Sequence, residues 1–284
     1  MRCDSHVHVV GPADIYPQSP TRTYLAEAAP LGKLCALARP CGIERFVIVQ
    51  PSFYGADNTV LLESLDALGG QGRGVAVVDP DTIARATLAA YAARGVRGLR
   101  LNLYSPMGNV DRARMAATLA ATAELAGALN WHVEVIAPIE VLAQEIESLA
   151  RTAVPVVIDH YGVFGRNEPT SSAGRQLLGL LRYPHVWMKL SAPYRVSDDL
   201  LDTKPNRPWL AAILAAAKER CVWGSDWPHT PPHRLQAGAD HPLAYRPIEY
   251  QALVDDFVAA LGSQELATAV LETNPARLYG FADA

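Results

Sequence analysis

The chain has 284 residues, of which 50% are hydrophobic and 19% are charged, and its formal net charge is -4 at pH 7. This length suits two average domains or one large α/β barrel, and the apolar content suffices for an extensive core. The mild negative charge argues against a nucleic-acid partner, which would need a basic face. The sequence has no run of about 18 apolar residues, so we expect no membrane-spanning helix.

The start of the chain lacks the basic and apolar regions of a secretory signal peptide. The four cysteines have no C-x-x-C spacing, and they are Cys3, Cys35, Cys41 and Cys221. We interpret them as small buried apolar side chains in a reducing compartment. These features predict a cytoplasmic protein.

Short β-rich segments alternate along the chain with longer segments rich in Ala and Leu. Eight segments are apolar enough for buried parallel strands: 3–10, 45–50, 74–79, 98–103, 132–137, 156–160, 186–192 and 221–226. Predicted helices follow them at 31–39, 58–68, 82–94, 112–129, 139–151, 172–182, 208–218 and 248–261. Eight such units predict a single-domain α/β protein, a (β/α)8 TIM barrel spanning 1–284. The alternative is an open doubly wound sheet, but no Gly-rich fingerprint follows the first strand.

The first predicted strand carries two histidines, His6 and His8. Because alternate residues of a strand face the same side, both imidazoles are expected to point into one space. Such a pair can bind a metal ion or polarise a carbonyl oxygen. The short pattern also fits a strand with two surface histidines.

Polar side chains recur where the predicted strands end, and the carboxyl ends of the strands carry the active site of a (β/α)8 barrel. The second strand ends in Gln50 and is followed by Ser52 and Tyr54, and the fourth carries Arg100 and Asn102. The sixth ends in His160, the seventh is followed by Arg195, and the eighth ends in Asp226 with His229 shortly after it. Core packing does not explain polar residues at one end of so many strands.

The core of the predicted site is three imidazoles and one carboxylate: His6, His8, His160 and Asp226. These groups can bind one divalent ion with an open coordination position, and zinc suits them best. They can also act without a metal, with Asp226 as a general base on water and the histidines stabilising an oxyanion. The residues alone leave both alternatives open.

Arg100 is predicted to face the barrel interior by strand alternation, where a buried guanidinium needs an anion. That anion is either a substrate carboxylate or a protein carboxylate such as Glu134. Arg195 is a second candidate for binding the substrate, and nearby hydroxyls can donate hydrogen bonds to the same ligand. His132 is the first residue of its predicted strand, so we expect it at the end of the barrel opposite the active site.

Residues 4–8 (DSHVH), the histidine of the sixth strand and residues 224–229 (GSDWPH) resemble the amidohydrolase superfamily. Residues 273–280 are similar to the C-terminal helix of that superfamily, so the resemblance extends over nearly the whole chain. Residues 50–58 and 98–102 resemble its lactonase branch, to which 2-pyrone-4,6-dicarboxylate lactonase belongs.

The resemblance implies hydrolysis of a lactone, often carboxylated, that derives from a sugar acid or from aromatic degradation. It implies Asp226 as the general base, the histidines around the lactone carbonyl, and Arg100 on a substrate carboxylate. Within the branch, the expectation is either no metal or one zinc ion. The lysine that supports two metals in the superfamily has no counterpart on the fourth or fifth strand, so no binuclear centre is expected.

The chain departs from the dicarboxylate lactonases at residues 104–107 (YSPM), where a second arginine is expected. The difference favours a substrate with fewer or differently placed anionic groups. Two alternatives are a zinc-dependent decarboxylase of an aromatic or muconic acid and a non-catalytic barrel that binds a sugar acid. The presence of Asp226 beside three histidines favours hydrolysis of a small anionic lactone.

Overall fold

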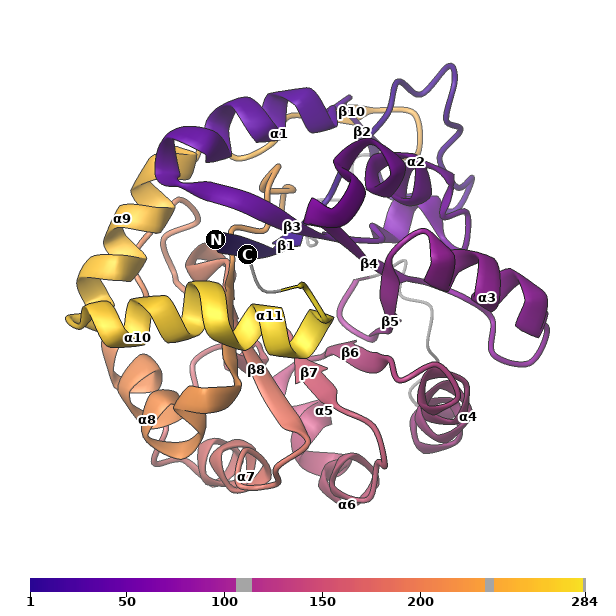
Figure 1. Ribbon diagram of the computed structural model, residues 1–284. Helices are drawn as coiled ribbons and strands as arrows, with labels where there is room; N and C mark the ends of the chain where they lie inside the picture. The colour runs from indigo at the N-terminus through magenta and orange to yellow at the C-terminus, as the bar shows by residue number, and fades with distance from the viewer. Residues whose placement is uncertain (106–113, 233–237, 283–284) are drawn as a thin grey trace.

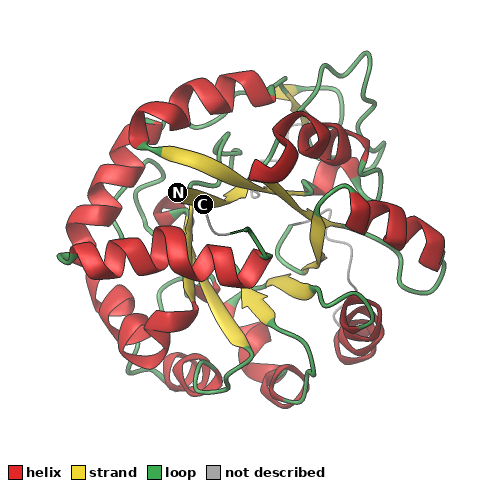
Figure 2. Ribbon diagram, in the orientation of Figure 1, coloured by secondary structure: helices red, strands yellow, loops and turns green. Residues whose placement is uncertain are grey.

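A computed structural model describes residues 1–105, 114–232 and 238–282. Eight parallel strands form one sheet in the order β1-β3-β4-β5-β6-β7-β8-β9. Strands are yellow in Figure 2 and lie inside the ring of red helices. Their bounds are β1 Arg2–Val7, β3 Ile43–Val49, β4 Gly72–Ala76, β5 Val96–Asn102, β6 His132–Ile136, β7 Val156–Ile158, β8 Val186–Ser191 and β9 Cys221–Gly224. A parallel bridge between Val7 and Trp227 brings the end of the sheet back to β1. The predicted (β/α)8 barrel is therefore confirmed.

Helices surround the strands on the outside of the barrel (Figure 1). Those that follow the strands are α1 Leu31–Ala38, α2 Thr59–Leu68, α3 Arg85–Ala93, α4 Met115–Gly127, α5 Ile139–Gln144, α6 Ile146–Ala150, α7 Ser172–Leu180, α8 Arg207–Ala217 and α9 Tyr250–Leu261. The chain then continues into α10 Gln264–Thr268 and α11 Asn274–Tyr279, and α11 crosses the barrel near both chain ends (Figure 1). No described helix is both long enough and apolar enough to cross a membrane.

Most predicted elements differ from the structure by a few residues at their ends, and three further differences concern the elements themselves or the first strand. The helix expected at 139–151 is broken at Glu145 into α5 and α6. The first strand, expected at 3–10, ends at Val7, and its register with β3 shifts between Asp4 and Val7. Two short strands, β2 Leu25–Ala26 and β10 Pro242–Leu243, pair across the first and last loops. Two-residue strands of this kind depend on a distant partner and leave no periodic pattern in the sequence.

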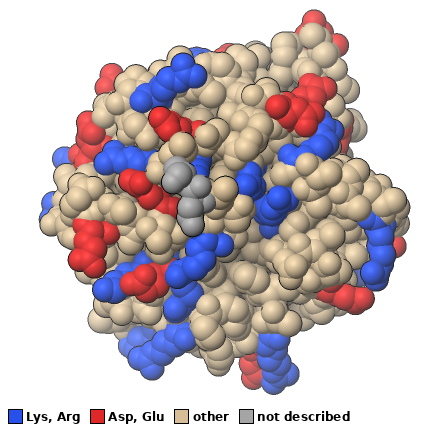
Figure 3. All heavy atoms as spheres, in the orientation of Figure 1, with Lys and Arg blue, Asp and Glu red and all other residues tan. Residues whose placement is uncertain are grey.

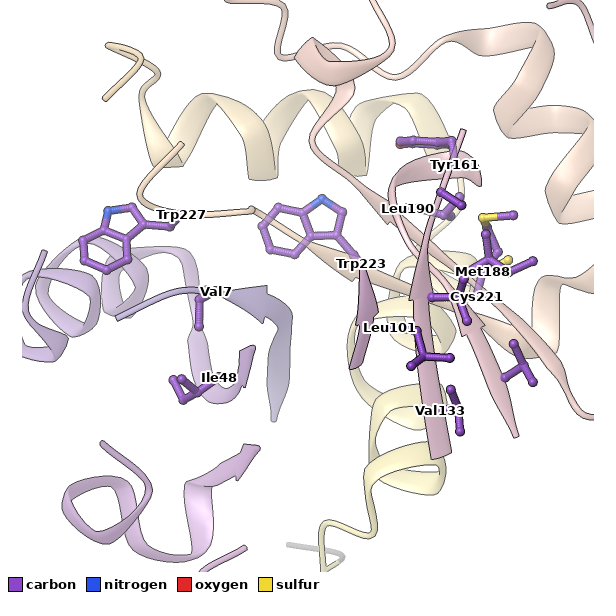
Figure 4. Packing of buried hydrophobic residues seen from close by; sticks show 14 of the residues in the cluster. Val7, Ile48, Leu101, Val133, Tyr161, Met188, Leu190, Cys221, Trp223 and Trp227 are labelled. Carbon is purple, nitrogen blue, oxygen red and sulfur yellow. The ribbon is translucent and has the colours of Figure 1, made fainter. Parts of the chain in front are cut away.

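Alternate side chains of the barrel strands belong to two different hydrophobic clusters. Leu101, Val133 and Met188 belong to the large hydrophobic cluster, part of which is seen in Figure 4. Alternate positions supply a smaller cluster that α11 and the C-terminal segment close, with members such as Val157 and Val222. Charged residues of both signs are interspersed on the face of the molecule seen in Figure 3.

The closure of the barrel leaves little space between β9 and β1. A Cβ atom added at Gly224 would lie 2.5 Å from the Cβ atom of His6. We expect Gly224→Ala to lower the free energy of unfolding by about 1–3 kcal/mol, because the two strands must separate. Urea denaturation measures this change.

The matched control is Gly179→Ala in α7, where an added Cβ meets no atom within 4 Å. This substitution should be neutral or stabilise the helix by about 0.5–1 kcal/mol. Equal free energies of unfolding for the two variants would contradict the close approach of β9 to β1.

Candidate active site

A narrow cavity opens among residues at the carboxyl ends of the strands and in the loops that follow them. Its lining consists of His8, Tyr24, Pro51, Ser52, Phe53, Arg100, Asn102, Ile136, His160, Arg195, Asp226 and Thr230. Seven of the predicted site residues are among them, and His6 lies in contact with two of these seven, His8 and Asp226. The cavity is therefore where the predicted residues meet.

One oxygen of Asp226 is the centre of the imidazole cluster. Its Oδ1 atom lies 3.4 Å from Nε2 of His8, 3.5 Å from Nε2 of His6 and 4.0 Å from Nε2 of His160. The Nε2 atoms of His6 and His8 are 3.3 Å apart. Asp226 follows β9 with a left-handed φ of 60°, which turns the chain at the strand end. The structure thus brings together three imidazoles and a carboxylate.

The other oxygen of Asp226 is held by two donors. Its Oδ2 atom accepts hydrogen bonds from Tyr194 Oη at 2.7 Å and Arg195 Nε at 2.6 Å. Burial alone would raise the pKa of Asp226, but Arg195 and His160 outweigh that effect and hold this pKa well below its usual range. Asp226 is consequently an ionised carboxylate at neutral pH, and Arg195, expected to bind substrate, is paired with it.

Hydrogen bonds behind two of the rings orient them toward the cavity. Nδ1 of His8 lies 2.7 Å from the carbonyl oxygen of Val49, so this nitrogen is the donor. Nδ1 of His160 lies 2.8 Å from Oγ of Ser191. Burial lowers the pKa of His160 to about 4 and that of His6 well below its ordinary value. Both His160 and His6 are therefore neutral at pH 7.

A buried charge cluster lies beneath the histidines. The Lys189 ammonium donates to Oε2 of Glu134 and lies 3.2 Å from Oδ1 of Asp159. It is also 3.1 Å from Nδ1 of His6. Burial and the neighbouring Asp159 raise the pKa of Glu134. Burial opposes ionisation of Asp159 as well, but Lys189 and His6 outweigh it and keep its pKa well below the usual range.

Arg100 connects this cluster to the cavity. Its guanidinium lies 3.9 Å from Oε1 of Glu134 and 3.8 Å from Oδ2 of Asp159, and it donates to the carbonyl oxygen of Gln50 at 2.8 Å. The same side chain lines the cavity. Arg100 can therefore face a protein carboxylate and a substrate carboxylate at once. One side of its guanidinium is near Glu134 and Asp159, and the side chain also lines the space where a ligand would bind.

Two predicted substrate contacts have other roles in the structure. The amide nitrogen of Gln50 donates to the carbonyl oxygens of Gly55 and Asp57, and the Tyr54 hydroxyl accepts a hydrogen bond from Gly11 N. Neither side chain lines the cavity, because each is used to hold the loops around it. Both side chains are thus engaged in loop contacts and not in the cavity.

The remaining predicted residues lie at the edge of the site. Oδ1 of Asn102 accepts hydrogen bonds from Tyr104 N and Ser105 N, while its side chain lines the cavity. His229 is buried behind Asp226, with Nδ1 3.2 Å from Tyr194 Oη. Residues 106–107, part of the segment that departs from the dicarboxylate lactonases, lie outside the described residues.

Four residues of the site were not among the predicted site residues: Glu134, which the sequence suggested only as a partner of Arg100, and Asp159, Lys189 and Tyr194. A signal existed for two of them, because Glu134 and Lys189 are single charged residues within otherwise apolar strands. A lysine was expected only on the fourth or fifth strand of the barrel, whereas Lys189 is on the seventh, β8. Asp159 directly precedes His160 at the carboxyl end of the sixth predicted strand.

The donor atoms fit a single divalent metal ion. The described residues contain two groups with suitable spacing: His6, His8 and Asp226, and His6, Asp159 and His160. In the first group the ligand atoms are 3.3, 3.4 and 3.5 Å apart. Tetrahedral ligands about 2.0–2.1 Å from zinc would be separated by about 3.3–3.4 Å. Oδ1 of Asp226 is buried and receives no hydrogen bond from any described residue, which leaves it available as a ligand.

The chain matches the amidohydrolase family over residues 3–281, so it belongs to that family. It is 29% identical to 4-sulfomuconolactone hydrolase of Hydrogenophaga intermedia, over 98% of this chain and 88% of the relative. A solved structure from Pseudomonas putida, named as a 2-pyrone-4,6-dicarboxylic acid hydrolase, is 31% identical with a TM-score of 0.82, covering 100% of this chain and 98% of that one. A similarly named Acinetobacter baumannii structure with citric acid bound is 25% identical, with a TM-score of 0.80 and 99% of both chains covered.

His132 lies at the start of β6, at the opposite end of the strand from the cavity, with its ring against Tyr279. Burial lowers the pKa of His132 to about 3. In the unfolded chain a histidine has a pKa of about 6.5. As pH falls below that value, the unfolded state takes up a proton that the folded state does not, and stability is lost.

We therefore expect His132→Phe to reduce the acid sensitivity of the fold. Between pH 7.5 and 5, the wild type should lose about 2 kcal/mol of unfolding free energy through this residue alone. The variant should lack that part of the loss, as measured by urea denaturation at both pH values. Val135→Ala on the same strand is the control, because it removes no titratable group and should lower stability equally at both. An unchanged pH slope in His132→Phe would mean that the buried ring is charged.

Proposed function

We propose that the protein hydrolyses a small lactone that carries at least one anionic group, of the sugar-acid or aromatic-degradation type. The observation that carries the proposal is the ionised Asp226 surrounded by three imidazoles in a cavity that Arg100 also lines. The relatives support it, because their names describe hydrolysis of a sulfonated or a dicarboxylated lactone. The citric acid in the Acinetobacter structure is likewise a polycarboxylate.

In the proposed mechanism, Oδ1 of Asp226 takes a proton from water, and the hydroxide attacks the lactone carbonyl. His8 orients the water, because the hydrogen bond from its Nδ1 atom to Val49 leaves Nε2 beside Oδ1 of Asp226. His160 is placed to donate from Nε2 to the developing oxyanion when Ser191 donates to its Nδ1 atom. One such donor is typically worth about 2.7–4 kcal/mol in the transition state.

The second half of the reaction returns the proton. The carboxyl group of Asp226 passes it to the ring oxygen as the lactone opens. Tyr194 and Arg195 hold Oδ2, so the reactive oxygen keeps its orientation through both steps. Arg100, together with the polar groups of Ser52 and Asn102, is proposed to position the anionic substituent of the substrate.

A single divalent ion, zinc by its ligand type, is compatible with this site. His6, His8 and Asp226 would hold it, with His160 nearby, and it would supply polarisation of the carbonyl or activation of water. The same residues would serve a zinc-dependent decarboxylase. Assays for acid release and for carbon dioxide release, before and after chelation, separate the two reactions. We also propose a cytoplasmic location, which the four free cysteines support.

Asp226→Asn removes the proposed base while keeping the shape of the side chain. We expect kcat on a lactone substrate to fall about 10²–10⁴-fold, because an amide does not take a proton from water. Acid release at constant pH over a panel of carboxylated lactones measures the rate, and calorimetry with a lactam analogue should find binding largely retained. Asp198→Asn, at an exposed carboxylate, is the control and should keep full activity. Retained turnover in Asp226→Asn would remove Asp226 from the role of base.

Arg100→Met tests recognition of the anionic group. We expect KM for a carboxylated lactone to rise about 10–100-fold, which corresponds to a lost charged hydrogen bond of about 1.5–3 kcal/mol. KM for an uncharged lactone of the same ring size should change little, and thermal denaturation controls for folding. A similar rise in KM for both substrates would contradict recognition of the carboxylate by Arg100.

A further inference from the structure

The first strand, β1, contains a bulge that changes the direction of its side chains. Cys3 belongs to the smaller hydrophobic cluster and Val7 to the larger one, so these two side chains face opposite sides of the sheet. In a regular strand, residues four positions apart face the same side. Asp4 pairs with Phe46 and Val7 pairs with Ile48, so three steps along β1 match two steps along β3. The segment after Asp4 therefore holds one extra residue, as at a β-bulge.

This bulge turns the imidazole of His6 into the barrel. His6 contacts Lys189 on β8, and since β1 and β8 are not neighbours in the sheet, the two side chains meet in the interior. Trp187, two residues before Lys189, faces the same side and lies in one cluster with Cys3. A period of two that starts at Cys3 would direct Val7 inward and His6 outward. The inward direction of His6 thus depends on the bulge.

The carboxylate of Asp4 lies at the bulge and accepts hydrogen bonds from two backbone N–H groups. Its Oδ1 atom accepts from His6 N at 3.2 Å and from Ser225 N at 2.9 Å. Its Oδ2 atom accepts from Oη of Tyr250, on α9, at 2.7 Å. Asp4 and His6 are fully buried and Ser225 is nearly so, and a buried N–H without an acceptor is costly. Asp4 therefore supplies an acceptor on both sides of the contact between β1 and the segment after β9.

The bond to Ser225 lies where the closure of the barrel has few other connections. Among the described residues, β9 and β1 are joined by one backbone bridge, between Val7 and Trp227, and by no regular ladder. Ser225 directly precedes Asp226, the residue that turns the chain with a left-handed φ. One carboxylate, that of Asp4, is consequently bonded to both chain segments whose side chains form the centre of the site.

We propose that Asp4 is a positioning residue for the reaction, because its carboxylate stabilises the bulge that turns His6 inward and ties this strand to the backbone beside Asp226. This inference deepens the proposed function, on which its catalytic meaning rests. Asp4 is not among the described residues that line the cavity. It acts through the relative placement of the imidazoles and the base, where an error of about 1 Å can cost about 10²-fold in rate.

Two substitutions of Asp4 separate the loss of the acceptor from the loss of the charge. Asp4→Ala removes the acceptor, and we expect kcat on a carboxylated lactone to fall about 10²-fold. KM should change little, because Arg100, the proposed contact of the anionic group, is on β5. Asp4→Asn keeps an oxygen that can accept from both N–H groups and should retain most of kcat. Circular dichroism gives the folded fraction to which the rates are normalised.

Asn274→Ala is the matched control, because it also removes two hydrogen bonds between a fully buried side chain and the backbone. Nδ2 of Asn274 donates to the carbonyl oxygens of Lys218 at 2.9 Å and Cys221 at 2.8 Å, at the end of β9 away from the site. This variant should have a lower free energy of unfolding and an unchanged kcat. Equal kcat values in folded Asp4→Ala and Asn274→Ala would overturn the positioning role.

Hydrogen exchange followed by NMR tests the same hydrogen bonds without any turnover. The amides of His6 and Ser225 should be protected in the wild type and in Asp4→Asn, and should exchange about 10–100-fold faster in Asp4→Ala. The amide of Val133, which donates to Pro155 O at 2.9 Å on another strand, should stay protected in all three proteins. Rapid exchange of either the His6 or the Ser225 amide in the wild type would overturn the proposal, whether or not Asp4→Ala folds.

The two measurements distinguish this inference from the proposed function. If the exchange rates are as expected but the wild type hydrolyses no lactone, Asp4 still holds the two backbone segments and the proposed function fails. If lactones are hydrolysed and folded Asp4→Ala keeps the wild-type kcat, the proposed function stands and the positioning role of Asp4 fails.

Discussion

The carboxylate of Asp226 is fully buried and yet ionised, and the candidate site is built around this requirement. A charge removed from water is tolerated only where polar or charged groups compensate for the lost hydration. Tyr194 and Arg195 compensate for one oxygen through short hydrogen bonds. The other oxygen faces the imidazoles and the cavity. The side chain is therefore held on one side and available for chemistry on the other.

The position of Asp226 depends in turn on the closure of the barrel. Its backbone N–H donates to the carbonyl oxygen of His6 at 2.8 Å, and the backbone N–H of His8 donates to Trp227 O at 2.7 Å. These bonds join the beginning of the chain to its last barrel strand. The absence of a side chain at Gly224 allows this approach. The same backbone hydrogen bonds therefore close the barrel between β1 and β9 and position Asp226 beside His6 and His8.

Below the site, the inward positions of the barrel carry charges where many barrels carry branched apolar residues. Glu134, Asp159 and Lys189 are fully buried, and Arg100 is nearly so. Buried ion pairs add little net stability, because desolvation offsets most of their attraction, although breaking one is costly. Their contribution here is direction: Lys189 contacts Glu134, Asp159 and His6, and Arg100 faces the same two carboxylates. The rings above them are held in defined orientations before any ligand binds.

Much of the fold was predictable from local patterns. Short β-rich apolar segments located all eight barrel strands, and parallel β/α units place all carboxyl ends at one edge. Convergence of His6, His8, His160 and Asp226 follows from those two facts. The broken helix at Glu145 and the β2–β10 pair did not follow, because they depend on contacts with distant segments.

The sequence by itself determined which side chains stand at which end of which strand, because the two-residue period of a strand is local. Only the tertiary structure decided how those side chains are paired. It joined Arg195 to Asp226, turned the Gln50 amide into a loop contact, and set Lys189 against His6. Hydrogen bonds and ion pairs are chosen over distances of about 3 Å. Periodicity and composition carry no information about such distances between segments that are far apart in the chain.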